Sequence, residues 1–138
     1  MILLLAPLIA IAVIGGVALV LRLQRGGQRE LVGNVVEPSA SRSRLPSILY
    51  FTGETCTICR TAQRPALRAL ADDIDPGIEI REIDIAVEPD LARRYRVMSL
   101  PTTIVLGPAG EVTEINVGFA SGEVLRRQLV DAGMPVAA

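Results

Sequence analysis

The chain begins with a long apolar segment and then alternates short apolar runs with polar turns. Residues 1–21 read MILLLAPLIAIAVIGGVALVL and contain no charged side chain. A helix rises about 1.5 Å per residue, so one of this length crosses a hydrocarbon core of about 30 Å. Pro7 and the glycines at 15–16 are tolerated in membrane helices. The pattern predicts a transmembrane anchor over residues 1–21.

A cleaved signal peptide is the alternative for this segment. Signal peptides carry a positive n-region, an apolar core of about 7–15 residues and a small-residue cleavage site. Here no Lys or Arg precedes the apolar core, and Leu19-Val20-Leu21-Arg22 is a poor cleavage site. We therefore favour an uncleaved anchor.

Positive charge gathers just after the apolar segment. Arg22, Arg25 and Arg29 follow it, whereas its N-terminal flank offers only the α-amino group. Because basic flanks stay in the cytoplasm, we expect a single-pass membrane protein with its soluble domain on the cytoplasmic side.

The rest of the chain divides into a polar tether and one domain. Residues 22–44 are rich in Arg, Gly and Ser and contain Pro38, which predicts a linker with at most a short strand over 31–36. Residues 45–138 carry the apolar runs of one folded domain, near the lower end of the common size range.

The apolar runs of this domain predict its helices and strands. We expect strands over 46–51, 78–85, 103–106 and 111–117, and helices from Cys56 or Thr57 to Asp73, over 88–95, and after an N-cap at Ser121. Pro65 predicts a kink in the first helix. A strand–helix–strand beginning requires parallel pairing, and the turn 107–110 predicts an antiparallel hairpin. The expected fold class is α/β, with a mixed four- to five-stranded sheet and helices on both faces.

Composition excludes several function classes. The net charge is −1, so nothing indicates binding of nucleic acid. The chain has no His, which removes the usual general base and the commonest metal ligand. We expect no nucleic-acid partner, no metal and no cofactor.

Both cysteines lie in the stretch Thr55-Cys56-Thr57-Ile58-Cys59-Arg60. A Cys-x-x-Cys motif beside a βαβ pattern predicts a redox pair. At a helix start, unpaired N–H groups and the positive end of the dipole would stabilise a thiolate at Cys56. Cys56 can then attack a substrate disulfide, and Cys59 can resolve the mixed disulfide.

Two other interpretations of the cysteines stay open. A structural zinc site needs four ligands, and the chain supplies two Cys and no His, so such a site would have to form between two chains. The other interpretation is an inert pair on a membrane-tethered domain.

Residues 45–133, roughly two-thirds of the chain, resemble a thioredoxin domain. The resemblance rests on the strand Ile48–Phe51 leading into Cys56–Cys59, the strand ending Ile83-Asp84-Ile85, the run Tyr95-Arg96-Val97-Met98-Ser99-Leu100-Pro101-Thr102, and the turn 107–110 with Gly118 beyond it. The anchor and Arg-rich tether are similar to those of membrane-bound thioredoxin-like proteins of actinobacteria and similar bacteria.

The resemblance implies a thioredoxin fold and a thiol–disulfide oxidoreductase tethered to a bacterial cell membrane. It implies a cis bond before Pro101, facing the cysteines, with the Leu100 backbone pairing with an extended substrate. An ordinary strand-entry proline is the alternative. Thr57 and Ile58 would also contact the substrate. The implied partners are protein disulfides, a reductase or thiol electron donor, and the lipid bilayer through residues 1–21.

Several positions depart from the family pattern. Thr55, Thr57 and Ile58 replace the usual Trp, Gly and Pro, so the reducing strength is not carried over. Tyr50 replaces a buried Asp, and Pro65 lies six residues after the second cysteine instead of five. These departures keep open an alternative function, that of a non-catalytic adaptor or redox sensor with the same fold.

Two further hypotheses concern charged side chains. Glu82 on the neighbouring strand would serve as a base if it were desolvated beneath the cysteines; a solvent-facing glutamate is the alternative. Arg60, Arg64 and Arg68 recur at helical spacing. They form either a solvated face or a basic stripe that favours the thiolate and docks an acidic partner or anionic lipid.

Overall fold

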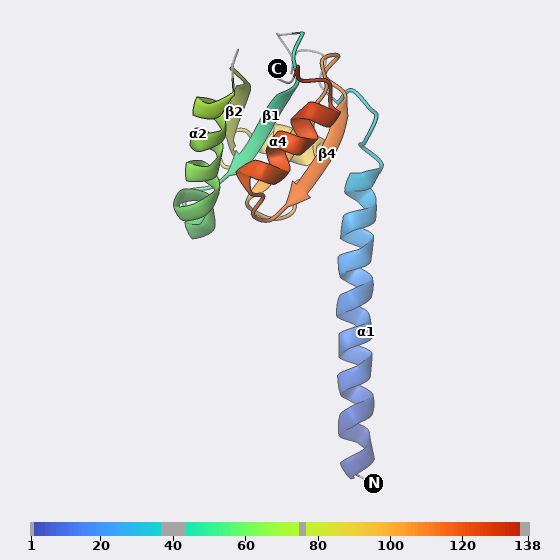
Figure 1. Ribbon diagram of the computed structural model, residues 1–138. Helices are drawn as coiled ribbons and strands as arrows, with labels where there is room; N and C mark the ends of the chain where they lie inside the picture. Colours follow the sequence, from blue (N-terminus) through green and yellow to red (C-terminus); the bar gives the residue numbers. More distant parts are fainter. Residues whose placement is uncertain (1, 37–43, 75–76, 136–138) are drawn as a thin grey trace.

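The computed structural model describes residues 2–36, 44–74 and 77–135 (Figure 1). A long helix, α1 (Ile2–Arg29), precedes the domain. The domain consists of β1 (Ser47–Thr52), the π-helical turn η1 (Cys59–Gln63), α2 (Arg64–Asp73), β2 (Glu79–Asp84), α3 (Pro89–Arg94), β3 (Thr102–Leu106), β4 (Val112–Val117) and α4 (Gly122–Asp131).

Among the described residues, four strands form one mixed sheet in the order β2-β1-β3-β4. β1 is parallel to β2 and antiparallel to β3, and β3 is antiparallel to β4. α2 and α4 pack on one face of the sheet and α3 on the other. The predicted mixed sheet with helices on both faces is confirmed.

β1 lies at the centre of the core and is buried along its whole length. Successive side chains of a strand point to opposite faces. Ile48 and Tyr50 therefore pack toward α2 and α4, whereas Leu49 and Phe51 pack toward α3. A strand covered on both faces carries a continuous apolar run without alternation.

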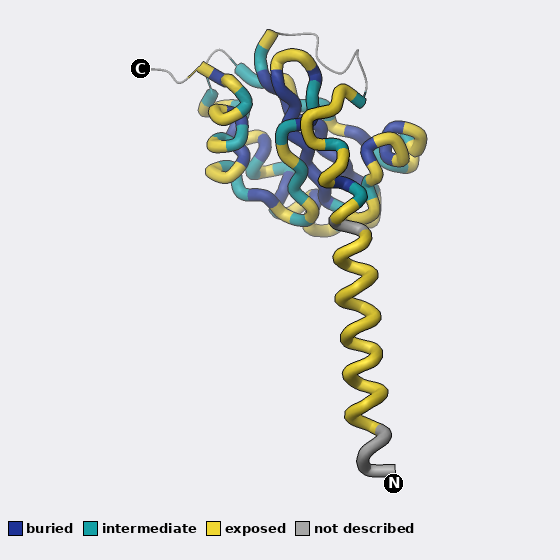
Figure 2. The backbone as a smooth tube through the Cα atoms, turned by 90° about the vertical axis from the view of Figure 1, so that its right-hand side faces the viewer, coloured by how far each residue is buried: buried dark blue, intermediate teal, exposed yellow. Residues whose placement is uncertain are grey.

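α1 is the one described helix that is long and apolar enough to span a membrane. Its candidate span, Ala6–Arg29, has a mean hydropathy of 2.3. The helix projects away from the domain, and residues 6–23 are exposed (Figure 2). Apolar side chains that no protein covers are those that lipid would cover.

The chain after the apolar segment differs from the expected linker over 22–44. The helix does not end at Leu21 but continues to Arg29. Val32 and Val35 then form bridges with Val112 and Glu111 beside β4. An edge strand has unpaired backbone groups, and this segment pairs with some of those of β4. Residues 37–43 of the expected linker lie outside the described residues.

The helix predicted to run to Asp73 is present, but η1 replaces the expected kink. Residues 57–58 and 64–73 are α-helical on either side of η1. In η1 the Arg64 N–H donates to the Cys59 carbonyl, five residues earlier, as in a π-helix. A π turn holds one residue more than an α turn. It therefore accommodates the extra residue between Cys59 and Pro65, which lies in the first turn of α2.

Gln63, at the end of η1, connects this turn to the segment before α4. Its side chain is fully buried. Nε2 donates to the Ala120 carbonyl at 3.0 Å, and Oε1 accepts from the Ala120 N–H at 2.9 Å. The two bonds hold η1 against the start of α4.

We predict that Gln63→Leu lowers the free energy of unfolding by about 2–4 kcal/mol, because it leaves two backbone groups of Ala120 buried without partners. Chemical denaturation of the full chain in detergent measures the loss. Gln128→Leu is the matched control, since Gln128 pairs with Asn116 in a partly buried site. Equal losses in the two variants would contradict the proposed importance of burial.

Candidate functional site

The two cysteines follow the carboxyl end of β1. A turn after Thr52 leads into the helix, and the Cys56 N–H donates to the Gly53 carbonyl at 3.1 Å. Phe51 pairs with Thr102 across β1 and β3. Because these strands are antiparallel, Pro101, just before β3, lies at the same edge of the sheet as the cysteine turn.

Cys56 and Cys59 form a disulfide with an S–S distance of 2.06 Å. Cys56 is half-buried, whereas Cys59 is fully buried in the core. The Cys59 N–H donates to the Cys56 sulfur, with N and Sγ 3.2 Å apart. The pair thus has one accessible sulfur, at the start of the helix, and one sulfur behind it.

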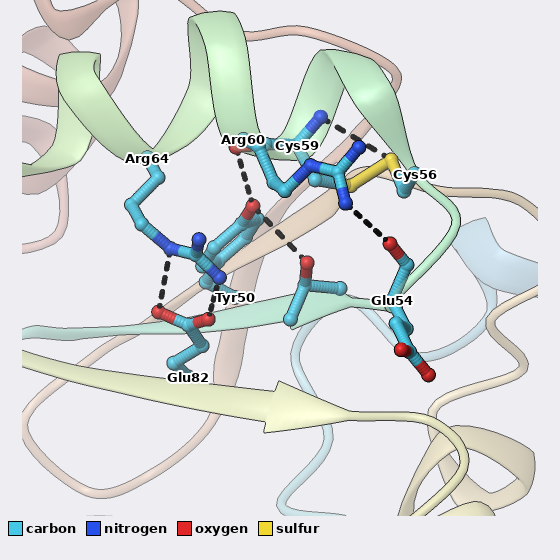
Figure 3. A network of polar contacts seen from close by, with 8 residues as sticks. Tyr50, Glu54, Cys56, Cys59, Arg60, Arg64 and Glu82 are labelled. Carbon is cyan, nitrogen blue, oxygen red and sulfur yellow. Dashed lines mark hydrogen bonds and ion pairs between the residues drawn. A yellow bond between two sulfur atoms is a disulfide. The ribbon is translucent and has the colours of Figure 1, made fainter.

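The residues around the disulfide are exposed. Thr57 and Ile58 face solvent, and Ile58 is 52% exposed. Arg60 donates to the Glu54 carbonyl at 2.9 Å, which places its guanidinium over the turn that precedes Cys56 (Figure 3). This surface is open to a partner and carries a positive charge beside the accessible sulfur.

The Leu100–Pro101 peptide bond is cis, as the resemblance implied. The Leu100 side chain packs closely on the cysteine turn: a Cβ added to Gly53 would lie 3.0 Å from Leu100 Cδ1. The Pro101 carbonyl accepts from the Gly118 N–H at 2.8 Å. Within the described part of the chain, the Leu100 N–H and carbonyl have no hydrogen-bond partner. They are available to an extended segment laid beside the cysteines.

Tyr50 lies directly beneath Cys59 (Figure 3). Its hydroxyl donates to the Cys59 carbonyl at 3.0 Å and lies 3.3 Å from the Thr52 hydroxyl. Burial raises the pKa of Tyr50, against a smaller lowering from the hydrogen bond with Thr52. Where the family usually has a buried acid, this chain therefore has a neutral hydrogen-bond donor that holds the backbone of the second cysteine.

Glu82 lies opposite Tyr50 on β2 and forms a two-point ion pair with Arg64 (Figure 3). The pKa of Arg64 is raised by this hydrogen bond. The side chain of Glu82 is 43% exposed. The desolvation that the proton-transfer hypothesis required is therefore absent, and the carboxylate is engaged by Arg64 instead.

The basic stripe is partly engaged within the domain. Arg60 binds the Glu54 carbonyl and Arg64 binds Glu82, while Arg68 is exposed. Among the described residues, no group of three or more His, Cys, Asp or Glu side chains is arranged to hold a metal ion.

We predict that Tyr50→Phe lowers the free energy of unfolding by about 1 kcal/mol at neutral pH, because it removes a buried hydrogen bond. Since the pKa of folded Tyr50 is raised above 10.0, the unfolded state ionises first as pH rises. The stabilisation is present below about pH 10 and lost as pH rises through the folded pKa. Denaturation between about pH 8 and pH 11 measures the difference from the wild type, which should shrink; a constant difference would contradict this.

The chain is similar in sequence and fold to known proteins. A family model for thioredoxin matches residues 36–131. The thioredoxin of Bacillus subtilis (strain 168) is 34% identical over 88 residues, covering 64% of this chain and 83% of the relative. The thioredoxin of Staphylococcus epidermidis (strain ATCC 12228) is 37% identical over 82 residues, covering 59% of this chain and 77% of the relative.

Among solved structures, a thioredoxin-2 described as a component of the malaria parasite protein secretion machinery has a similar fold. The TM-score is 0.58 at 26% identity, over 63% of this chain and 82% of that one. The family model spans more than half of the chain and includes both cysteines and Pro101. This chain therefore belongs to the thioredoxin family.

Proposed function

We propose that the chain is a membrane-tethered thiol–disulfide oxidoreductase that reduces or exchanges disulfides in proteins. Membership of the family supports thiol–disulfide chemistry in general. The observation that carries the specific proposal is the pairing of a half-buried Cys56 at a helix start with a fully buried Cys59. The accessible sulfur of Cys56 can attack a substrate disulfide, and the buried sulfur of Cys59 is placed to resolve the mixed disulfide that results.

The reaction begins with the reduced pair. The Cys56 thiolate attacks one sulfur of a substrate disulfide, forms a mixed disulfide and expels one substrate thiolate. The Cys59 thiolate then attacks the Cys56 sulfur, expels the second substrate thiolate and forms the Cys56–Cys59 disulfide. Two electrons pass to the substrate sulfurs, and the two expelled thiolates take up the two protons that Cys56 and Cys59 released on ionising. A dithiol reductant restores the pair by the same exchange in reverse.

The substrate segment lies between the cysteine turn, residues 53–56, and the Pro101 loop, residues 96–101. The Leu100 N–H and carbonyl pair with its extended backbone, as in strand addition. Thr57 and Ile58 contact its side chains from the other side. Pro101 holds this loop at the edge of the sheet, next to Cys56.

The tether is α1, and its orientation follows from charge. Arg22, Arg25 and Arg29 flank the apolar segment on the domain side, which favours a cytoplasmic domain. In that compartment the pair rests reduced, with electrons from a cellular reductase. A C-terminal fusion to a reporter that works only after export tests this orientation: an active reporter would overturn it.

We predict that the full chain in detergent accelerates reduction of insulin by dithiothreitol, and that Cys56→Ser returns the rate to background because the attacking thiolate is gone. Cys59→Ser should accumulate a mixed disulfide, visible on non-reducing gels, because the resolving thiol is missing. An adaptor or redox sensor would give no rate above that of Cys56→Ser, which would reject the enzyme.

We predict that Glu82→Gln changes the rate of insulin reduction by less than about tenfold, because an exposed, ion-paired carboxylate is poorly placed as a base. Initial rates beside the wild type measure the effect, and circular dichroism confirms the fold. A slowing of tenfold or more with an intact fold would restore a proton-transfer role for Glu82.

A further inference from the structure

The C-terminal end of α1 is fastened to the domain beside the Pro101 loop. The Gln28 side chain is 6% exposed, and its Nε2 donates to the Arg96 carbonyl at 2.8 Å. The Arg96 guanidinium donates in turn to the Gly27 carbonyl and to Glu30 Oε2, the latter at 2.8 Å. We call these bonds the α1–Arg96 contact.

Arg96 is an unusual residue for its position. Its φ of 52° is the only positive value at a residue other than glycine in the described part of the chain. The Val97 N–H donates to the Ala92 carbonyl and the Arg96 N–H to that of Arg93. These are the bonds of a helix end at which glycine is the usual residue. Glycine would adopt the turn more easily, and the arginine adds a side chain that reaches α1.

The α1–Arg96 contact determines which turns of α1 lie beside the Pro101 loop, residues 96–101. One cavity is lined by Val20 and Leu23 of α1 together with Val97 and Met98 of the domain. Val20 lies at the end of the apolar segment 1–21 and Leu23 just beyond it, where a membrane-spanning helix would leave the hydrocarbon. With α1 across a bilayer, the loop that runs from Arg96 to Pro101 would therefore lie level with the membrane surface.

The catalytic edge of the sheet faces the same way. β1 and β4 both end at the edge where β3 begins, since Thr102 pairs with Phe51 and with Val117. In Figure 1 the arrowheads of β1 and β4 point downward, the direction in which α1 runs from the domain to its N-terminus. With α1 across a bilayer, the cysteine turn that follows β1 would thus face the membrane.

Each loop at this edge also carries an exposed apolar side chain. Ile58 follows β1, Val87 follows β2, Met98 precedes β3 and Phe119 follows β4, with exposures of 52%, 78%, 71% and 52%. We call these four residues the apolar rim. Apolar side chains around a charged or polar centre suit the headgroup region, where apolar and polar groups meet.

We propose that the α1–Arg96 contact holds the apolar rim and Cys56 against the membrane surface, so that the substrates are disulfides in the juxtamembrane segments of membrane-bound proteins. This inference rests on the proposed function and narrows its substrate class. The chemistry is the exchange described above, with the same dithiol reductant. A freely swinging domain would instead accept disulfides at any height above the bilayer.

The test uses the full chain in liposomes of phosphatidylcholine and phosphatidylglycerol, with two substrates that each carry one disulfide and one membrane anchor. One disulfide lies about 5 residues from its anchor and the other about 25. The two linkers therefore let the disulfide reach very different distances from the bilayer. We expect the proximal disulfide to be reduced at least about tenfold faster, as expected for a large difference in effective concentration.

The informative variant is Arg96→Gly combined with Gln28→Ala. Glycine suits the positive φ, so the turn stays intact while the α1–Arg96 contact is lost. We expect the proximal-to-distal ratio to fall below about threefold as the domain gains freedom, with insulin reduction in detergent unchanged. Arg94→Ala, which removes an exposed arginine from the same helix end, should keep the wild-type ratio.

Two results would overturn the inference: equal rates for both substrates in the wild type, or a full ratio in the double variant. If insulin and both substrates are reduced, at rates that do not depend on the distance between disulfide and anchor, the inference is rejected and the proposed function stands. No reduction of insulin or of either substrate would reject the proposed function, and the inference with it.

A second readout does not depend on activity. The chain contains no Trp, so Phe119→Trp places a single fluorophore on the apolar rim. Lipids brominated near the headgroup should quench it in the wild-type background and much less in the double variant. Ala109→Trp, in the turn between β3 and β4 at the opposite edge, should not be quenched. Equal quenching at the two positions would contradict the proposed orientation.

Discussion

The antiparallel pairing of β3 with β1 is the constraint on which the site depends. It joins Thr102 to Phe51, so the strand that leads into the cysteine turn ends where the strand after Pro101 begins. Parallel pairing would place Pro101 at the opposite edge, remote from Cys56. The close packing of Leu100 on Gly53 follows from the same register. β1 is buried on both faces, and a shift of its register by one residue would turn every β1 side chain to the opposite face of the sheet. The side chains that pack toward α2 and α4 would then exchange places with those that pack toward α3, so the register resists slippage.

The difference in exposure between Cys56 and Cys59 follows from the hydrogen bonds that hold η1 in place. Cys59 belongs to the apolar core beneath the helix, whereas Cys56 lies at its exposed start. Tyr50 bonds the Cys59 carbonyl from below, and Gln63 bonds both backbone groups of Ala120. These bonds fix the backbone of the buried cysteine while they leave the first cysteine accessible. A neutral hydroxyl at position 50 performs this structural task without placing a charge in the core.

The hydrogen bonds between the end of α1 and Arg96 fix the domain relative to the helix. A flexible linker confines a domain to a membrane but leaves its orientation free. Here the helix continues past the apolar segment and bonds the residue that begins the Pro101 loop. The element that would enter the bilayer and the loop that would receive the substrate are therefore neighbours in space, although 66 positions separate Glu30 from Arg96. In the function proposed above, the same contact would therefore both anchor the domain and select its substrates.

Local chemistry determined much of this protein from the sequence alone. The uncharged segment 1–21, the apolar runs of the strands, the Cys56–Cys59 spacing and the Pro101 motif each carry their meaning within a few residues, because periodicity and turn chemistry are local properties. The tertiary structure decided what depends on distant partners. Gly26 and Gly27 disfavour a helix, yet α1 passes through them and is fastened to Arg96. An extra residue before Pro65 fits either a kink or a π turn, and here η1 is bonded to Tyr50 and Ala120. Glu82 pairs with Arg64 and stays partly exposed, because strand register and helix packing bring the two side chains together. Contacts between residues far apart in the chain are set by how the layers pack, and no local pattern records them.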